Sequence, residues 1–189
     1  IYDRKWSKKK NEKKTIDFKK LKKIKIEDAL IKILSSPNHS NKSWITDQYD
    51  QMVMCDTAQR SGSDAAIIRI HNKDKAIAVS VDSSANYCKS HPLTGGKQIV
   101  CENWRNLITV GAKPLAITNC LNFGNPESED VMREFAECLE GIKKACEFLN
   151  YPIVSGNVSF YNGTNKKNIF PTPVIGGVGL IKKIFKPLS

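Results

Sequence analysis

The sequence predicts an α+β fold in which a mixed or antiparallel four-stranded sheet carries its helices on one face. Two observations lead to this class. Short apolar runs of strand character and longer runs of helical periodicity follow one another in the order αββαβαββ, so the elements are segregated rather than strictly alternating. Two of the helical runs are long. A sheet covered on one side only leaves its other face in need of a partner, either a second copy or another domain.

The positive charge is concentrated at the N-terminus. The net charge is +11, and residues 1–32 hold 13 basic and 5 acidic side chains, whereas residues 33–189 hold 17 and 14. The folded part is therefore nearly neutral, so the basic pI is not a nucleic-acid footprint. Residues 1–25 form a lysine-rich arm that could bind polyanions such as RNA. The simpler interpretation is a solvated linker, which makes a nucleic-acid partner the less favoured alternative.

The composition favours an intracellular protein. No apolar run approaches the roughly 20 residues of a membrane helix, and no signal peptide is visible. Six cysteines lie without C-x-x-C spacing, which is typical of a reducing cytosol. We therefore expect a cytoplasmic location and no membrane partner. The first residue is Ile rather than Met, so we expect a fragment or a processed piece of a longer protein.

The first half of the chain predicts one helix and one hairpin. Apolar spacing in residues 26–34 suits a short amphipathic helix. Two apolar runs, 65–70 and 76–81, flank a turn and predict a β-hairpin. Asp64 precedes the first strand and Asp82 follows the second. Paired carboxylates of this kind can hold Mg²⁺ and a polyphosphate, and they can equally cap turns.

The second half predicts two long helices between strands. Gly95-Gly96 is expected to open a helix over 97–110, with Gly111 as its C′ residue. The run 114–117 follows as a strand. Ser128 is expected to cap the longest helix, whose apolar positions are 131, 135, 138, 139, 142, 146 and 149. Short strands at 152–154 and 172–181 complete the domain.

Two polar stretches, each placed directly after an apolar run, predict a pocket at strand ends. The first, 118–126, contains Asn119, and the second, 151–162, contains Gly156, Asn157 and Ser159. Gly156 lets a ligand approach its backbone closely. Asn157 and Ser159 are two residues apart and would face the same side of a strand. Either stretch alone is also compatible with an ordinary Gly- and Asn-rich turn.

Several of these motifs, in unbroken order over residues 35–181, resemble phosphoribosylformylglycinamidine synthase of purine biosynthesis. The resemblance is highly specific in combination. It covers Gly62-Ser63-Asp64-Ala65-Ala66, Asp82, residues 111–119 (GAKPLAITN), residues 121–126 (LNFGNP), residues 155–162 (SGNVSFYN) and residues 171–176 (PTPVIG). It implies the N-terminal domain of the second aminoimidazole-ribonucleotide-synthetase-like half, spanning 26–186, with 1–25 as an interdomain linker. It also implies that the C-terminal partner domain is absent and that the sheet pairs with a second such domain.

The resemblance implies an ATP-dependent C–N ligase with glutamine as amide donor. The family converts formylglycinamide ribonucleotide to the formylglycinamidine, with ATP and Mg²⁺ as cofactors. Its partners would be the remaining domains of the synthase, a glutaminase subunit and a small accessory subunit. A homodimer through the sheet is a further possibility. No catalytic residue is expected in this chain, so alone it would be inactive.

The resemblance also assigns roles to individual residues. Asn119 and Gly156 match ATP contacts, Asn157 matches a Mg²⁺ ligand and Ser159 matches a substrate contact; Asp64 and Asp82 are weaker site candidates. Two departures matter: Asn119 stands where many members have Asp, and Asn106 stands where the catalytic first half has an acidic metal ligand. The second departure motivates the alternative of a non-catalytic structural or regulatory module that binds ADP and Mg²⁺.

Overall fold

The structure is a computed structural model that describes residues 3–7, 17, 24–49, 53–60 and 62–184. The chain divides into two compact units, Lys9–Asp50 and the combination of Ile1–Lys8 with Gln51–Ser189. The lysine-rich segments 8–16 and 18–23 lie outside the described residues, and so do the polyanion contacts expected of them. No helix within the described ranges is long and apolar enough to span a membrane.

The smaller unit contains short helices. The predicted helix over residues 26–34 is confirmed as α1 (Ile26–Leu34), which has acidic residues in its first turn and Lys32 in its last. Both placements are favourable for the helix dipole. A 3₁₀ turn, η2 (Pro37–His39), and a single helical turn, α2 (Ser43–Thr46), follow.

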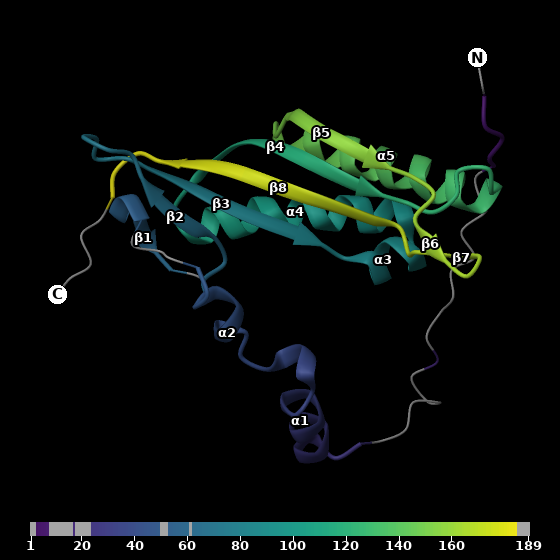
Figure 1. Cartoon of the computed structure of the whole chain (residues 1–189), viewed down its shortest axis with the longest axis horizontal. Helices are drawn as coiled ribbons and strands as arrows, with labels where there is room; N and C mark the ends of the chain where they lie inside the picture. Colours follow the sequence, from purple (N-terminus) through teal and green to yellow (C-terminus); the bar gives the residue numbers. More distant parts are fainter. Residues whose placement is uncertain (1–2, 8–16, 18–23, 50–52, 61, 185–189) are drawn as a thin grey trace. The chain divides into compact units, whose positions relative to one another are not determined.

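The larger unit is built on one six-stranded sheet with its helices on one face, so the predicted α+β class is confirmed (Figure 1). The strand order is β1-β2-β3-β8-β4-β5, and every neighbouring pair is antiparallel except β4 with β5. The strands are β1 (Thr57–Gln59), β2 (Ala66–Arg69), β3 (Ala76–Ser83), β4 (Lys113–Asn122), β5 (Ile153–Ser159) and β8 (Thr172–Ile181).

The expected count of four strands is too low. The edge strand β1 is three residues long and has no apolar alternation, so only its pairing with β2 makes it a strand. A separate two-stranded hairpin, β6 (Gly163–Thr164) with β7 (Lys167–Asn168), follows β5. Such short elements carry no periodic signal in the sequence.

The helix layer consists of α3 (Ala85–Ser90), α4 (Pro92–Thr109) and α5 (Glu129–Leu149); a 3₁₀ turn, η3 (Val53–Cys55), precedes β1. The start of α4 was predicted five residues too late, because Gly95-Gly96 lies inside the helix. A Cβ on Gly95 would lie 2.6 Å from the Cys88 backbone nitrogen, and one on Gly96 would collide with the Cys138 carbonyl. The two glycines therefore permit close helix packing rather than a turn. Gly111, with φ +78°, ends the helix as predicted.

The prediction for α5 is confirmed. All seven predicted apolar positions are buried or packed against the core. Ser128 occupies the N-cap position, but its side chain makes no capping hydrogen bond. The helix ends at Asn150 in the left-handed conformation, with φ 50°, a conformation that Asn tolerates better than most residues.

A buried polar network ties the helix layer to the sheet. The Asn103 side chain is completely buried, and its Nδ2 donates to the Ser80 carbonyl (3.0 Å) and to Asp82 Oδ2 (2.8 Å). Its Oδ1 accepts from the Tyr151 hydroxyl at 2.8 Å. Burial raises the pKa of Tyr151, which keeps this hydroxyl a neutral donor. A fully satisfied buried network of this kind fixes the register of α4 on β3.

Among the described residues of the larger unit, no element covers the face of the sheet opposite the helices. This open face has two halves. Over β2, β3 and β8 it is apolar, with exposed side chains of Ile68, Ile77, Val81 and Val178. Over β4 and β5 it is polar; strand alternation places Thr118, Cys120, Asn122, Ser155, Asn157 and Ser159 on this half. We call these the apolar half and the polar half of the open face.

Candidate functional site

The predicted site residues lie within strands rather than in turns that follow them. The expected strand 114–117 extends over 113–122, and the expected strand 152–154 extends to Ser159. The prediction ended both strands too early because their apolar patterns stop at polar side chains. The backbone groups of these polar residues are nevertheless hydrogen-bonded in the β4–β5 and β4–β8 ladders, whatever their side chains. The parallel ladder still brings both stretches together, as predicted.

The register divides the site between the two faces of the sheet. Asn119 pairs with Gly156, and both lie on the helix side with the buried Ile175. Asn157 and Ser159 lie two residues apart on the polar half of the open face, as their spacing predicts. β5 is the last strand of the sheet. A ligand that contacts all four residues must therefore pass around this edge strand.

Asn119 and Gly156 are in direct contact across the two strands. The Asn119 Oδ1 atom occupies the space that a Cβ on Gly156 would fill. The glycine therefore accommodates the amide of Asn119 on this face. No hydrogen bond holds the Asn119 side chain among the residues that the structure describes, so its amide is available to a ligand.

Asn157 and Ser159 differ in how they are held. The Asn157 side chain is exposed and makes no hydrogen bond within the described ranges. Ser159 is half-buried, and Asn162 Nδ2 lies 3.0 Å from both its Oγ and its carbonyl oxygen. The Asn157 side chain is thus free to bind a ligand, whereas the Ser159 side chain is held in place by Asn162.

The loops after β4 and β5 are joined to each other at this end of the sheet. Phe123 N–H donates to the Ser159 carbonyl (3.0 Å), and Tyr161 N–H donates to the Gly124 carbonyl (3.0 Å). Asn168, in the β6–β7 hairpin, accepts from the Asn125 N–H at 2.9 Å. The two backbone bonds make one rigid wall from two stretches that are far apart in the sequence. The Asn168 bond lies outside this wall and fixes the β6–β7 hairpin to the loop after β4.

The two weaker candidates occupy different surroundings. Asp64 is exposed in the turn before β2. Asp82 is half-buried and directed at α4, where its carboxylate accepts from the side chains of Asn103, Asn106 and Ser80, each at 2.8 Å. The described part of the chain contains no group of three or more His, Cys, Asp or Glu side chains arranged to hold a metal ion.

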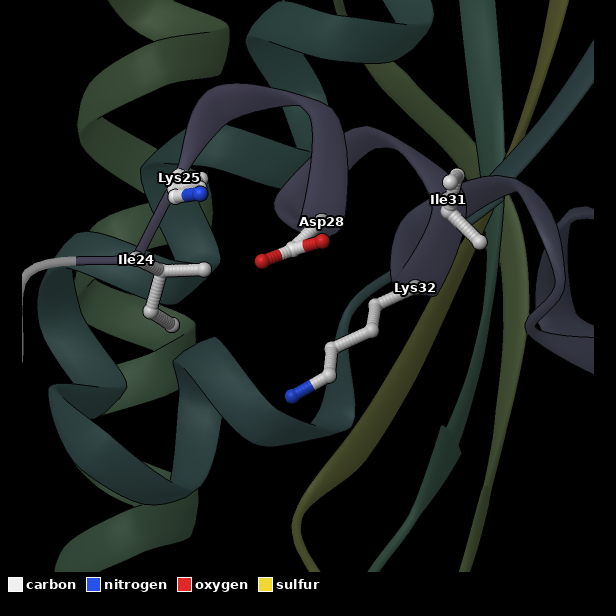
Figure 2. Close-up of a pocket in the computed structure, with 5 residues that line it drawn as sticks. All are labelled: Ile24, Lys25, Asp28, Ile31 and Lys32. Carbon is white, nitrogen blue, oxygen red and sulfur yellow. The ribbon is translucent and has the colours of Figure 1, made fainter.

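A surface hollow in the smaller unit contains none of the predicted site residues. It is lined by α1 and the residues just before it (Figure 2): Ile24, Lys25, Asp28, Ile31 and Lys32. Its single carboxylate, on Asp28, is accompanied by two lysines: Lys25, which precedes α1, and Lys32 in the last turn of α1. The hollow lacks the amide and hydroxyl groups that mark the polar half of the open face.

The fold and the strand-end residues have a counterpart among known families. The sequence model described as "AIR synthase related protein, N-terminal domain" matches residues 62–181, from the loop before β2 to the end of β8. The chain belongs to this family. All four predicted site residues lie within the matched part of this AIR synthase-related domain.

The relatives of this AIR synthase-related domain are much longer than the chain. A phosphoribosylformylglycinamidine synthase subunit PurL from Pelagibacter ubique is 60% identical over 183 residues, which are 96% of this chain and 25% of the relative. Another subunit PurL, from Azorhizobium caulinodans, is 49% identical over 88% of this chain and 23% of its own length. The chain thus spans about a quarter of the curated relatives it matches.

Solved structures of PurL from Thermotoga maritima share the fold. The structure of PurLQS matches with a TM-score of 0.71 and 37% identity over 75% of this chain and 24% of that one. The complex with ATP matches with a TM-score of 0.67 and 36% identity over 75% and 23%. The complex with FGAR matches with a TM-score of 0.68 and 37% identity over 78% and 24%.

The sequence assigns no role to Asn162, although the structure ties it to Ser159. One of its two carbonyl partners, on Phe123, directly follows β4, and the other, on Ser159, ends β5. No local pattern reveals such a contact. The one sequence feature that indicates this contact is that Asn162 follows Ser159 by three residues in a turn, where Asn side chains commonly hydrogen-bond to the backbone.

Proposed function

We propose that this chain is part of a phosphoribosylformylglycinamidine synthase. In that reaction, ATP activates the amide oxygen of formylglycinamide ribonucleotide, and ammonia from glutamine displaces the phosphate to give the formylglycinamidine. The single observation that carries the proposal is 60% identity to a PurL subunit across 96% of the chain. The relatives' complexes with ATP and FGAR support both ligands.

The geometry supports separate roles on the two faces of β4 and β5. Asn119, over Gly156, offers ATP an amide on the helix side that has no hydrogen-bond partner among the described residues. Ser159 offers a hydroxyl to substrate on the polar half of the open face. Phosphoryl transfer depends mainly on positioning and charge stabilisation. The rigid wall formed by the loops after β4 and β5 provides such positioning without a catalytic side chain.

Asn157 fits a Mg²⁺ ligand. Its exposed amide has no partner in the described ranges, and an amide oxygen is an acceptable ligand for a hard cation. Mg²⁺ usually takes one or two protein ligands and completes its shell with phosphate oxygens and water. One amide oxygen on this face therefore suffices for this chain's share. When bound, the ion would neutralise charge on the transferred phosphoryl group.

The apolar half of the open face supports the proposed pairing with a second domain of the same kind. Exposed Ile and Val side chains lie together over three neighbouring strands, and patches of this type mark interaction surfaces. The second domain would come from the rest of a longer subunit or from a second copy of this chain. The glutaminase and small accessory subunits are proposed as further partners, in line with the relative solved as PurLQS.

If the proposal holds, this chain should support synthase activity when it replaces the matching part of a related PurL subunit. In a hybrid subunit, residues 1–189 replace the matching quarter of the Pelagibacter ubique PurL. We expect ATP- and ammonia-dependent formation of formylglycinamidine ribonucleotide within about tenfold of the unmodified relative, since the matched residues are 60% identical. The isolated chain should make none. A folded hybrid without product, beside an active relative, would count decisively against the proposal.

One contact favours a second candidate, a non-catalytic module that binds ADP and Mg²⁺. Asn106 donates to Asp82 Oδ1 at 2.8 Å, so an amide ties down the carboxylate instead of supplying a metal ligand. Calorimetry of the isolated chain with ADP and Mg²⁺ separates the two functions. Tight binding that substrate does not alter, together with an inactive hybrid, would favour the module.

A further inference from the structure

We propose that Asn162 is a positioning residue that holds the Ser159 hydroxyl as a hydrogen-bond donor toward an oxygen atom of the substrate. This rests on the proposed function, in which Ser159 contacts substrate. Asn162 Nδ2 lies 3.0 Å from each of three acceptors: the Phe123 carbonyl, the Ser159 carbonyl and Ser159 Oγ. One side chain thus joins the ends of β4 and β5 to the proposed substrate contact.

The chemistry of these partners determines which way the Asn162 amide faces. Backbone carbonyls only accept hydrogen bonds, so the NH₂ end must point at Phe123 and Ser159. Its two protons serve three acceptors, and Ser159 Oγ shares one of them. The alternative bond, from the Ser159 hydroxyl to Asn162 Oδ1, is longer at 3.3 Å. Because Ser159 Oγ accepts from Asn162, its own proton is left to point outward.

The backbone adopts a disfavoured conformation to place Asn162 there. Tyr161 has φ 61°, in the left-handed region that aromatic residues rarely occupy. Asn162 N–H donates to the Phe123 carbonyl at 3.2 Å, which holds the turn. Phe160 packs edge-on against Phe135 with ring centroids 5.0 Å apart, which anchors the turn in the core. Strain of this kind concentrates at functional sites.

The outward direction of the Ser159 hydroxyl proton determines which ligand atoms this hydroxyl can bind. An oriented hydroxyl donor recognises an acceptor oxygen, which in a ribonucleotide is a phosphate, a ribose or an amide carbonyl oxygen. A freely rotating hydroxyl would also accept from donors and would lose more freedom on binding. Asn162 therefore contributes to substrate affinity through Ser159, without touching the substrate itself.

The test is a double-mutant cycle in the hybrid subunit with Ser159→Ala, Asn162→Ala and the pair. We expect each single change to raise KM for formylglycinamide ribonucleotide about tenfold, with kcat changed less than about threefold and the KM for ATP unchanged. The double variant should match the singles, because both remove one interaction. Asn168→Ala is the matched control: it removes a loop hydrogen bond, to Asn125, that does not reach Ser159, and should leave KM unchanged.

Asn162→Asp extends the test if the alanine variant fails to fold. An aspartate keeps the shape but only accepts, so it turns the Ser159 proton inward and should raise KM at least as much. An unchanged KM in a folded Asn162 variant, an additive double variant, or an equal effect of Asn168→Ala would overturn the inference. A silent Ser159→Ala, or an inactive wild-type hybrid, would instead overturn the proposed function and this inference with it.

Discussion

Replacing Gly177 with Ala should reduce the free energy of unfolding by about 3 kcal/mol or more. A Cβ on Gly177 would lie 2.8 Å from Asn103 Cγ and closer still to Asn103 Oδ1 and the Tyr151 hydroxyl. Both side chains are fully buried and bonded to each other. To admit the methyl group they must move, which leaves buried polar atoms unpaired. Urea unfolding of the chain would measure the loss, which corresponds to roughly 10 °C in Tm.

Gly176→Ala is the matched control for this variant. Gly176 is adjacent in β8 but faces the open side, where its Cβ would meet the Thr118 methyl at 3.1 Å and the Thr118 carbonyl oxygen at 4.0 Å. Away from such conflicts, Ala restricts the unfolded chain and is mildly stabilising. We expect a change within about 1 kcal/mol. Equal destabilisation by the two substitutions would show that the Asn103–Tyr151 network does not depend on Gly177.

Replacing Asn157 with Leu in the hybrid subunit should lower kcat/KM for ATP about 100-fold. The substitution keeps the approximate size of the side chain but removes the amide oxygen proposed as the Mg²⁺ ligand. Because Asn157 is exposed and unpartnered within the described residues, we expect the Tm to change by no more than about 2 °C. Steady-state assays at several Mg²⁺ concentrations would show the loss as a higher requirement for the ion.

Ser155→Ala provides the control on the same strand and face. Ser155 lies two residues before Asn157 in β5 and is also exposed. It should retain activity within about twofold, because no ligand contact is proposed for Ser155 and single changes of exposed side chains have small effects. Equal losses from the two substitutions would mean that this edge strand responds to any change, and full activity in Asn157→Leu would remove it from the metal site.

The long amphipathic elements could be predicted because their burial follows one period. α5 shows this best: its apolar positions recur at helical spacing and all pack against the core. Gly95 and Gly96 gave the opposite result. Their role in close helix packing depends on Cys88 and Cys138, which are not their neighbours in the sequence. The sequence alone therefore predicts a helix start at these glycines.

The candidate site was predicted from its residue types, but the arrangement of these residues depends on the sheet. The spacing of Asn157 and Ser159 was enough to place them on one face. No local sequence pattern predicts that Asn119 lies on the other face of the sheet. Its placement depends on the registers of β4 with β5 and with β8. The contact between Asn162 and Phe123 is likewise a product of tertiary structure.

The most direct test of the account is calorimetric titration of the hybrid subunit with AMPPCP, a nucleotide bound by the Thermotoga maritima relative, with and without Mg²⁺. The central claim is that β4 and β5 hold a nucleotide through Asn119 and its metal ion through Asn157. We expect Mg²⁺ to tighten binding at least tenfold in the wild-type hybrid, and this gain to vanish in Asn157→Leu while metal-free affinity persists. The same Mg²⁺-dependent gain in both proteins would contradict the claim.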